Sequence, residues 1–298
     1  AMVLRLSFES DNADLDQLWQ ESLNTIAICM RDTFMDCPER ERGPYMGDAT
    51  NQMDAAFYSY DGSGLDMTKK AILACVAWTS DSGAIPSRAP SVKPQEIPNQ
   101  SLVFMPTVYH YWLHSGDAGT VTAYYRAFVN YLKLYEMDDS GLPKYRAGSW
   151  QWNDWGKKID ADLLQTGFYY YALSAAAKLA EELGITEDGE FLSGRMKTMK
   201  SAWREAFYTE EGFRSKGSPY VDERANALLA LSGLAGEEDW ELITNVIMNT
   251  YEASPFTEKY VLEALCVMGH TDLALQRILS RYDLMLHDEW NTLWELFS

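Results

Sequence analysis

The sequence predicts an all-α fold, an (α/α)6 barrel in which six helix pairs form one ring. Apolar residues recur at intervals of three and four along most of the 298 residues, and strand-like alternation is almost absent. Most breaks between the periodic segments are short, which favours antiparallel neighbouring helices. No fixed repeat period is visible, so a closed ring is favoured over an open superhelix, which stays the alternative. The whole chain, 1–298, is expected to form this single domain.

The segment 160–183 illustrates how each helix is assigned. Asp160 is a suitable N-cap and Gly184 a suitable residue to follow the last turn. Between them, the apolar residues spaced by three or four are Leu164, Phe168, Tyr171, Ala175, Leu179 and Leu183. The same reading places twelve helices at about 13–34, 48–60, 65–79, 101–116, 118–136, 160–183, 188–208, 221–233, 237–250, 256–268, 271–283 and 288–298.

Two connections between the predicted helices are long. Residues 80–100 carry four prolines, and residues 137–159 contain the aromatic run "GSWQWNDWG". Long connections inside a compact helical domain are usually functional. In a barrel, the connections at one end converge on a central pocket, so we expect these segments to line it.

The acidic composition limits the ligands that the chain can bind. Lys and Arg number 25 against 44 Asp and Glu, for a formal net charge of -19. This charge disfavours nucleic acid, anionic membrane surfaces and polyanionic substrates as partners. The 10 Trp and 18 Tyr suit stacking on sugar rings, although aromatic helix packing explains many of them.

Targeting, metal and cofactor signals are weak throughout. The first residues lack the apolar stretch of a signal peptide, and no apolar run is long enough to span a membrane, so no compartment is assigned. Cys29 and Cys75 lie in apolar helical runs and are expected to be buried. His110 and His114 are spaced four apart but lack an evident third ligand, so no metal and no cofactor are predicted.

The first of three polar clusters is "DCPERERGPYMGDA", residues 36–49. Pro38 and Pro44 prevent a continuous helix through it, so its charges cannot form an ordinary solvated helix face. Two interpretations remain open from the residue types. The stiff segment positions a reactive carboxyl such as Glu41, or its arginines neutralise neighbouring acids and fix the corner between two helices.

The second cluster, "SWQWNDWG" at 149–156, places three tryptophans around Asp154. These indoles form either a platform for a sugar ring, with the carboxylate accepting hydroxyl protons, or a buried plug at one end of the barrel.

The third cluster is "DEWNTLWELFS", residues 288–298. On a helix beginning near Asp288, Asn291, Trp294 and Glu295 would share one side. A Glu beside a Trp in an apolar stretch is a candidate for a perturbed pKa, although an ordinary exposed Glu is the alternative.

Together these clusters resemble the catalytic domain of bacterial α-L-rhamnosidases, glycoside hydrolase family 78. The residues that carry the resemblance are "DCPERERGPYMGDA" at 36–49, "WQWNDWGKKID" at 150–160, "SPFTEKYVLEALCVMGHTDLALQRI" at 254–278 and "NTLWE" at 291–295. The resemblance implies an (α/α)6 barrel that removes terminal α-L-rhamnose with inversion at the anomeric carbon. It also implies that the chain is the barrel of a longer protein, without the β-domains that flank it.

The resemblance assigns roles motif by motif. Glu41 is implied as the general acid that protonates the departing oxygen, and Glu295 as the general base that activates water. Asp36, Arg40 and Asp48 are implied to hold the rhamnose hydroxyls. The remaining implied sugar-binding residues are Tyr45, which stands where many members carry Trp, with Trp152, Asp154, Trp155 and Trp294.

This mechanism places conditions on the site. Inverting hydrolysis requires two carboxyls roughly 6.5–9.5 Å apart, with room for one water. The acid needs a raised pKa, which an adjacent Arg lowers, so Arg40 and Arg42 are expected to point away from Glu41 or to be offset by Asp36 and Asp48.

Three functions therefore compete. The first is hydrolysis of rhamnose-containing oligosaccharides, polysaccharides or glycosides. The second is a non-catalytic carbohydrate-binding toroid, which the two opposed acids disfavour. The third is another (α/α)6 enzyme, such as a different glycosidase or a polysaccharide lyase; the acidic balance disfavours the lyase.

Overall fold

The computed structural model describes residue 4 and residues 6–297. Within this part of the chain the helices are α1 (Ala13–Cys29), α2 (Met46–Ser59), α3 (Gly62–Ala77), α4 (Pro98–Ser115), α5 (Ala118–Leu132), α6 (Ala161–Leu183), α7 (Gly189–Phe207), α8 (Glu223–Leu231), α9 (Trp240–Asn249), α10 (Pro255–Val267) and α11 (Thr271–Leu286). A short 3-10 helix, η1 (Glu237–Asp239), precedes α9, and a small hairpin of β1 (Tyr208–Thr209) and β2 (Gly212–Phe213) follows α7.

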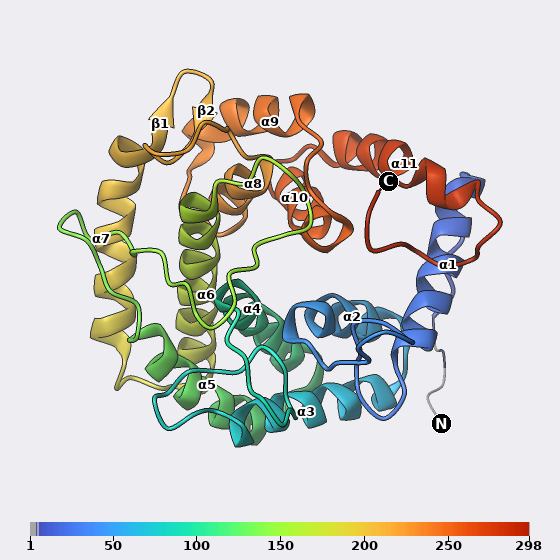
Figure 1. The fold of residues 1–298 in the computed structure, drawn as a ribbon, viewed down its shortest axis with the longest axis horizontal. Helices are drawn as coiled ribbons and strands as arrows, with labels where there is room; N and C mark the ends of the chain where they lie inside the picture. The colour runs from blue at the N-terminus through green and yellow to red at the C-terminus, as the bar shows by residue number, and fades with distance from the viewer. Residues whose placement is uncertain (1–3, 5, 298) are drawn as a thin grey trace.

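The helices form a ring with an inner and an outer layer (Figure 1). The even-numbered helices line the inside, and the odd-numbered helices pack around them. Each inner helix contacts the next, from α2 through α4, α6 and α8 to α10, and α10 contacts α2 to close the ring. On the outside, α11 meets α1 at the same seam. The predicted (α/α)6 barrel is therefore confirmed.

Burial explains the order of the layers. Helix α4, in the inner layer, is buried from Pro98 to Val108 without interruption, whereas α7 in the outer layer buries only Leu192, Met199, Trp203 and Phe207. A helix that is apolar on every side needs partners on every side, whereas an amphipathic helix needs one buried face.

Several local predictions are also confirmed. The Asp160 side chain accepts a hydrogen bond from the Leu163 amide, and Gly184 takes a left-handed conformation with φ of 67° at the end of α6. Cys29 and Cys75 are buried. The small 208–213 hairpin, in contrast, was not predicted, because its strands are only two residues long.

The prediction that the first helix runs to residue 34 is wrong. Helix α1 ends at Cys29, and Met30 adopts an extended conformation. The chain then makes a tight turn in which the Met35 amide donates to the Cys29 carbonyl, and Phe34 and Met35 are buried. Burial of these two side chains outweighs the helical periodicity of the sequence, so the helix ends at Cys29.

The twelfth predicted helix is also wrong. Residues 287–297 form an irregular segment, so Asn291, Trp294 and Glu295 do not share a helix face. The backbone of this segment bonds to neighbouring helices: the Leu293 amide donates to the Thr25 hydroxyl, and the Asn24 amide side chain donates to the Asn291 carbonyl. These tertiary contacts replace the intrahelical bonds that the periodicity predicted. Figure 1 shows the segment crossing past α1 and turning back toward the ring.

The described residues contain no helix that is both long enough and apolar enough to cross a bilayer.

Candidate active site

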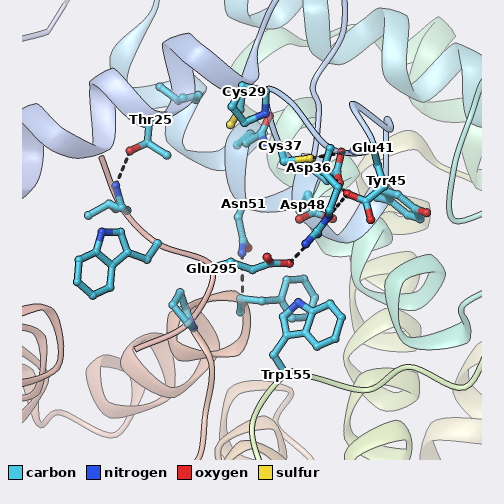
Figure 2. Close-up of a pocket in the computed structure, with 18 of the residues that line it drawn as sticks. Thr25, Cys29, Asp36, Cys37, Glu41, Tyr45, Asp48, Asn51, Trp155 and Glu295 are labelled. Atoms are coloured by element: carbon cyan, nitrogen blue, oxygen red, sulfur yellow. Dashed lines mark hydrogen bonds and ion pairs between the residues drawn. The ribbon is translucent and has the colours of Figure 1, made fainter. Parts of the chain in front are cut away.

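A cavity of about 450 Å³ opens at one end of the ring. Segments distant in sequence line it: helix α1, residues 36–55, the loop of residues 150–155 with its three tryptophans, the first residues of α10 and residues 293–295. The sequence-predicted residues that lie on its wall are Asp36, Arg40, Glu41, Tyr45, Asp48, Trp152, Trp155, Trp294 and Glu295. Figure 2 shows Glu295 on the C-terminal segment facing the side where Asp36, Glu41 and Asp48 lie.

A closed loop presents the carboxyl of Glu41. The Asp36 amide donates to the Gly43 carbonyl, and the Gly43 amide donates back to the Asp36 carboxylate at 2.6 Å. Inside the loop, the Glu41 amide contacts the Cys37 thiol at 3.3 Å. Arg42 has a positive φ of 50° and donates to the Pro38 carbonyl. The segment is therefore held by its own bonds rather than by helix geometry.

One guanidinium lies between the two carboxyls that the sequence singled out. The Nε of Arg40 lies 2.5 Å from Glu41 Oε2, and its Nη2 lies 3.5 Å from Glu295 Oε1. Both nitrogens belong to one planar group, so these two oxygens lie no more than about 8 Å apart. Residues 41 and 295, from opposite ends of the sequence, are thus brought to one side of the cavity.

Arg40 neither points away from Glu41 nor is offset by Asp36, whose hydrogen bond also lowers the pKa of Glu41, so the expectation is wrong for Arg40. The hydrogen bond from Arg40 is the main cause that lowers the pKa of Glu41, so this carboxyl is ionised more readily than usual. Arg42 instead donates to the Pro38 carbonyl. The pair is exposed to solvent, because 63% of the Arg40 side chain and 38% of the Glu41 side chain are accessible. A ligand can therefore compete for the guanidinium.

The pKa values of two neighbouring carboxyls, those of Asp36 and Asp48, are raised rather than lowered. Desolvation, with smaller effects of the nearby Asp36, Glu295 and Glu41 carboxylates, raises the pKa of Asp48 to about 7. Desolvation also raises the pKa of Asp36, against the bonds it accepts from Cys37 and Gly43. Four carboxyls close together cannot all ionise at low cost, so at neutral pH we expect Asp48 to carry a proton part of the time.

Aromatic side chains form the opposite wall. Trp152 packs edge-on against Trp155, with 5.6 Å between ring centroids, and lies 5.1 Å from Phe256 at the start of α10. Trp155 and Trp150 are exposed at the mouth of the cavity. Figure 2 shows Trp155 reaching up from its loop toward Glu295. Indole faces of this kind bind the apolar face of a sugar ring.

Asp154 does not line the cavity, unlike its tryptophan neighbours. Its side chain is buried and accepts bonds from Arg224 at 2.8 Å, from the Ser254 amide at 3.0 Å and from the Thr257 hydroxyl at 3.0 Å. The hydrogen bonds from Arg224, Ser254 and Thr257 occupy its carboxylate, which is therefore not available to a ligand. The direct sugar contact implied for Asp154 is replaced by a structural contact that fastens the Trp152 and Trp155 loop to α8 and α10.

One group of described residues has metal-ligating atoms close together. The carboxylates of Asp36 and Glu41 and the thiol of Cys37 place one ligand atom each within 4.8 Å of one another. The same atoms bond to one another and to Arg40. His110 lies elsewhere, on Asp54 of α2 at 3.1 Å.

Three amide side chains in the cavity wall, namely those of Asn51, Gln52 and Gln100, were not predicted from the sequence. A signal was available for two of them. On a helix beginning near Asp48, positions 51, 52 and 55 follow at the three-, four- and seven-residue intervals of one face. Gln100 carries no such signal, because its place depends on how α4 packs against α2.

A sequence model of the bacterial α-L-rhamnosidase 6-hairpin glycosidase domain matches residues 5–298. The chain belongs to this family. No curated protein sequence matches it.

Solved structures agree with the rhamnosidase family fold. The rhamnosidase from Klebsiella oxytoca with rhamnose bound aligns with a TM-score of 0.89 at 20% identity, over 98% of this chain and 59% of the other. The glycoside hydrolase family 78 rhamnosidase of Bacillus sp. GL1 aligns with a TM-score of 0.87 at 24% identity, over 99% and 32%. The α-L-rhamnosidase of Streptomyces avermitilis, in complex with L-rhamnose, aligns with a TM-score of 0.82 at 17% identity, over 100% and 30%.

This rhamnosidase-family domain thus spans less than two thirds of each of these proteins. Its cavity nevertheless gathers both carboxyls and most of the aromatic residues that the sequence motifs single out.

Proposed function

We propose that the chain is the catalytic domain of a glycoside hydrolase that removes terminal α-L-rhamnose with inversion. The observation that carries this proposal is the Arg40 bridge between Glu41 and Glu295. It keeps the two carboxylate oxygens no more than about 8 Å apart, and the roughly 6.5–9.5 Å separation of carboxyls in inverting enzymes is compatible with this upper limit. Membership of the rhamnosidase family supplies the substrate class.

In the proposed reaction, Glu41 donates its proton to the glycosidic oxygen as the bond from that oxygen to the anomeric carbon breaks. A water between the sugar and Glu295 attacks the opposite face of the same carbon, and Glu295 takes the proton that this water loses. The products are the free alcohol and a sugar of inverted configuration. Glu41 ends ionised and Glu295 protonated, and exchange with solvent restores both.

The carboxyl-rich wall suits a neutral sugar. Asp36 and Asp48 border the same cavity and can accept bonds from sugar hydroxyls, and Trp155 can cover the apolar face of the ring. The substrate must draw Arg40 away from Glu41, because the acid has to hold a proton when the bond breaks. A hydroxyl that accepts from Arg40 would do this and would raise the pKa of Glu41 at the moment of binding.

The proposal is tested by incubating the chain with 4-nitrophenyl α-L-rhamnoside and following the product by NMR. We expect β-L-rhamnose as the first sugar released, before mutarotation. Release of the α anomer first would contradict inversion. Binding of L-rhamnose without turnover would instead support the carbohydrate-binding toroid that the sequence left open.

A pH profile tests the role of Arg40. Because Arg40 lowers the pKa of Glu41, the basic limb of kcat/KM should lie at acidic pH in the parent. Arg40→Met removes this effect, so the limb should move to higher pH, even if the maximal rate falls. High salt should move the parent limb in the same direction, since the pair is exposed. Arg42→Met, which removes a loop cation outside the bridge, should leave the limb in place; an unmoved limb in Arg40→Met would contradict the assignment.

A further inference from the structure

The cavity contains a group of neutral side chains that neither the family assignment nor the acid pair explains. Asn51 and Gln52 of α2 and Gln100 of α4 line it, together with Trp152. In each amide the oxygen is buried and has no hydrogen-bond partner in the protein, and the indole Nε1 of Trp152 is also buried and unpartnered. Buried polar atoms are usually paired. Among the described residues, 14 buried side-chain nitrogen or oxygen atoms have no protein partner, and four of them belong to residues that line this one cavity.

Other buried amides show that the fold can pair such groups. Gln165 accepts from the Arg146 amide and donates to the Arg146 carbonyl. Asn99, the immediate neighbour of Gln100, donates to Asn153 and accepts from Gln165. Asn226 is bonded in the same way at both ends of its side chain. The buried Asn and Gln side chains of the described chain are those of Asn99, Gln100, Gln165 and Asn226. Of these four, only Gln100 lines the cavity, and only its oxygen has no protein partner.

Neighbouring contacts fix the orientation of two of these amides. The Asn51 amide nitrogen donates to the Phe256 carbonyl, and the Gln52 amide nitrogen donates to the Met35 carbonyl at 2.6 Å. These bonds assign each nitrogen, so the remaining atom of each side chain is the acceptor oxygen. Figure 2 shows the Asn51 side chain at the centre of the cavity, with its bond to the start of α10.

Close packing positions the third. Gln100 is 5% exposed, and its Cγ would lie 2.8 Å from a Cβ placed on Gly47. The glycine before Asp48 therefore lets the Gln100 side chain lie directly against the α2 backbone. A larger residue at position 47 would displace both Gln100 and Phe256.

We propose that Asn51, Gln52 and Gln100 form a neutral acceptor floor whose amide oxygens receive the hydroxyl protons of the bound sugar, with Trp152 Nε1 and the Gln100 amide nitrogen as donors. The inference rests on the proposed function and specifies the ligand further. Acceptor amides beside the carboxyls of Asp36 and Asp48 select a donor-rich, uncharged sugar. A uronate in this cavity would place its own carboxylate next to the amide oxygens and the carboxyls of Asp36 and Asp48, which cannot donate hydrogen bonds to it when ionised.

Gln100→Met is the decisive variant, because the Gln100 amide holds no other part of the protein. Methionine keeps the length of the side chain and removes an unpaired buried oxygen, so the melting temperature should stay the same or rise. Affinity for L-rhamnose, measured by calorimetry, should fall about 10-fold, the effect of one lost hydrogen bond to a buried group. D-glucuronate should not bind the parent detectably.

Two matched controls separate recognition from folding. Gln165→Met removes an amide that is paired at both ends, so it should lower the melting temperature and leave L-rhamnose affinity unchanged. Gln276→Met, on the exposed face of α11, should change neither. In a series of monodeoxy rhamnosides, the one that lacks the hydroxyl donating to Gln100 should bind the parent and Gln100→Met with equal affinity.

The outcomes distinguish this inference from the proposed activity. Gln100→Met with affinity within twofold of the parent, or with a lower melting temperature like that of Gln165→Met, would overturn the acceptor floor. A parent that binds L-rhamnose without hydrolysing it would overturn the activity alone, and the variants would still decide the inference by calorimetry. A parent that binds D-glucuronate as tightly as L-rhamnose would overturn the selection of an uncharged sugar.

Discussion

Glu41→Gln should lower kcat/KM for aryl α-L-rhamnosides by roughly 1,000-fold, since a positioned general acid contributes about 100- to 10,000-fold. The loss should depend on the leaving group. The Glu41→Gln variant should hydrolyse a 2,4-dinitrophenyl rhamnoside, whose departing oxygen needs no proton, much faster than an alkyl rhamnoside. Glu295→Gln should lower kcat/KM by a similar factor with every leaving group, because it removes the proposed base that activates water. The measurement is kcat/KM across a leaving-group series.

Two neighbouring glutamates provide controls of equal chemistry. Glu39 lies in the same loop as Glu41, and Glu289 lies in the same irregular segment as Glu295; both are exposed. Glu39→Gln and Glu289→Gln should retain nearly full activity. If Glu41→Gln or Glu295→Gln also turned over at the parent rate, its assigned role would be refuted.

The largest expected effect on stability is that of Arg224→Met. The Arg224 guanidinium is buried, lies 2.8 Å from Asp154 and 2.7 Å from Asp222, and donates to the Lys157 carbonyl. Its removal leaves two buried carboxylates without their cation, which typically costs about 3–5 kcal/mol. Chemical denaturation should show this loss, and any remaining folded protein should bind sugar more weakly, because the loop of Trp152 has lost its attachment to α8 and keeps only the one to α10.

An exposed ion pair on the same loop gives the comparison. Lys158 lies 2.6 Å from Glu252, and 60% of the lysine side chain is accessible to solvent. Lys158→Ala should change the free energy of unfolding by less than about 1 kcal/mol, as is usual for surface pairs. Equal effects of the two substitutions would show that burial does not set the strength of the Arg224 contacts.

The architecture was predictable because it depends on patterns that the sequence repeats many times. Apolar spacing and short breaks located α2 to α11 with small errors at their ends. The errors lie where tertiary contacts compete with periodicity. Residues 30–35 leave the first helix because Phe34 and Met35 find burial elsewhere. Residues 287–297 stay irregular because α1 supplies bonds to their backbone.

The candidate site was predictable to the extent that motifs carry it. The motifs named both carboxyls, but they did not indicate that Arg40 would join them, because side-chain direction depends on the closed loop that Asp36 and Gly43 form. Asp154 was assigned to the wall since it stands between two tryptophans, although its partners lie on α8 and α10. Gln100 was missed because packing between inner helices has no local signature.

The anchoring of the C-terminal segment has a consequence for dynamics. Residues 291–295 are attached to α1 by two hydrogen bonds, in which the Asn24 side chain donates to the Asn291 carbonyl and the Leu293 amide donates to the Thr25 hydroxyl. The Trp294 amide also contacts the Met285 sulfur of α11, and Glu295 itself is exposed. An irregular segment held by so few bonds can detach while the ring stays folded, at a free energy far below that of global unfolding. The fraction of molecules competent to activate water would then be set by this local equilibrium. Warming or mild denaturant would then abolish the proposed activity before any loss of helix could be detected.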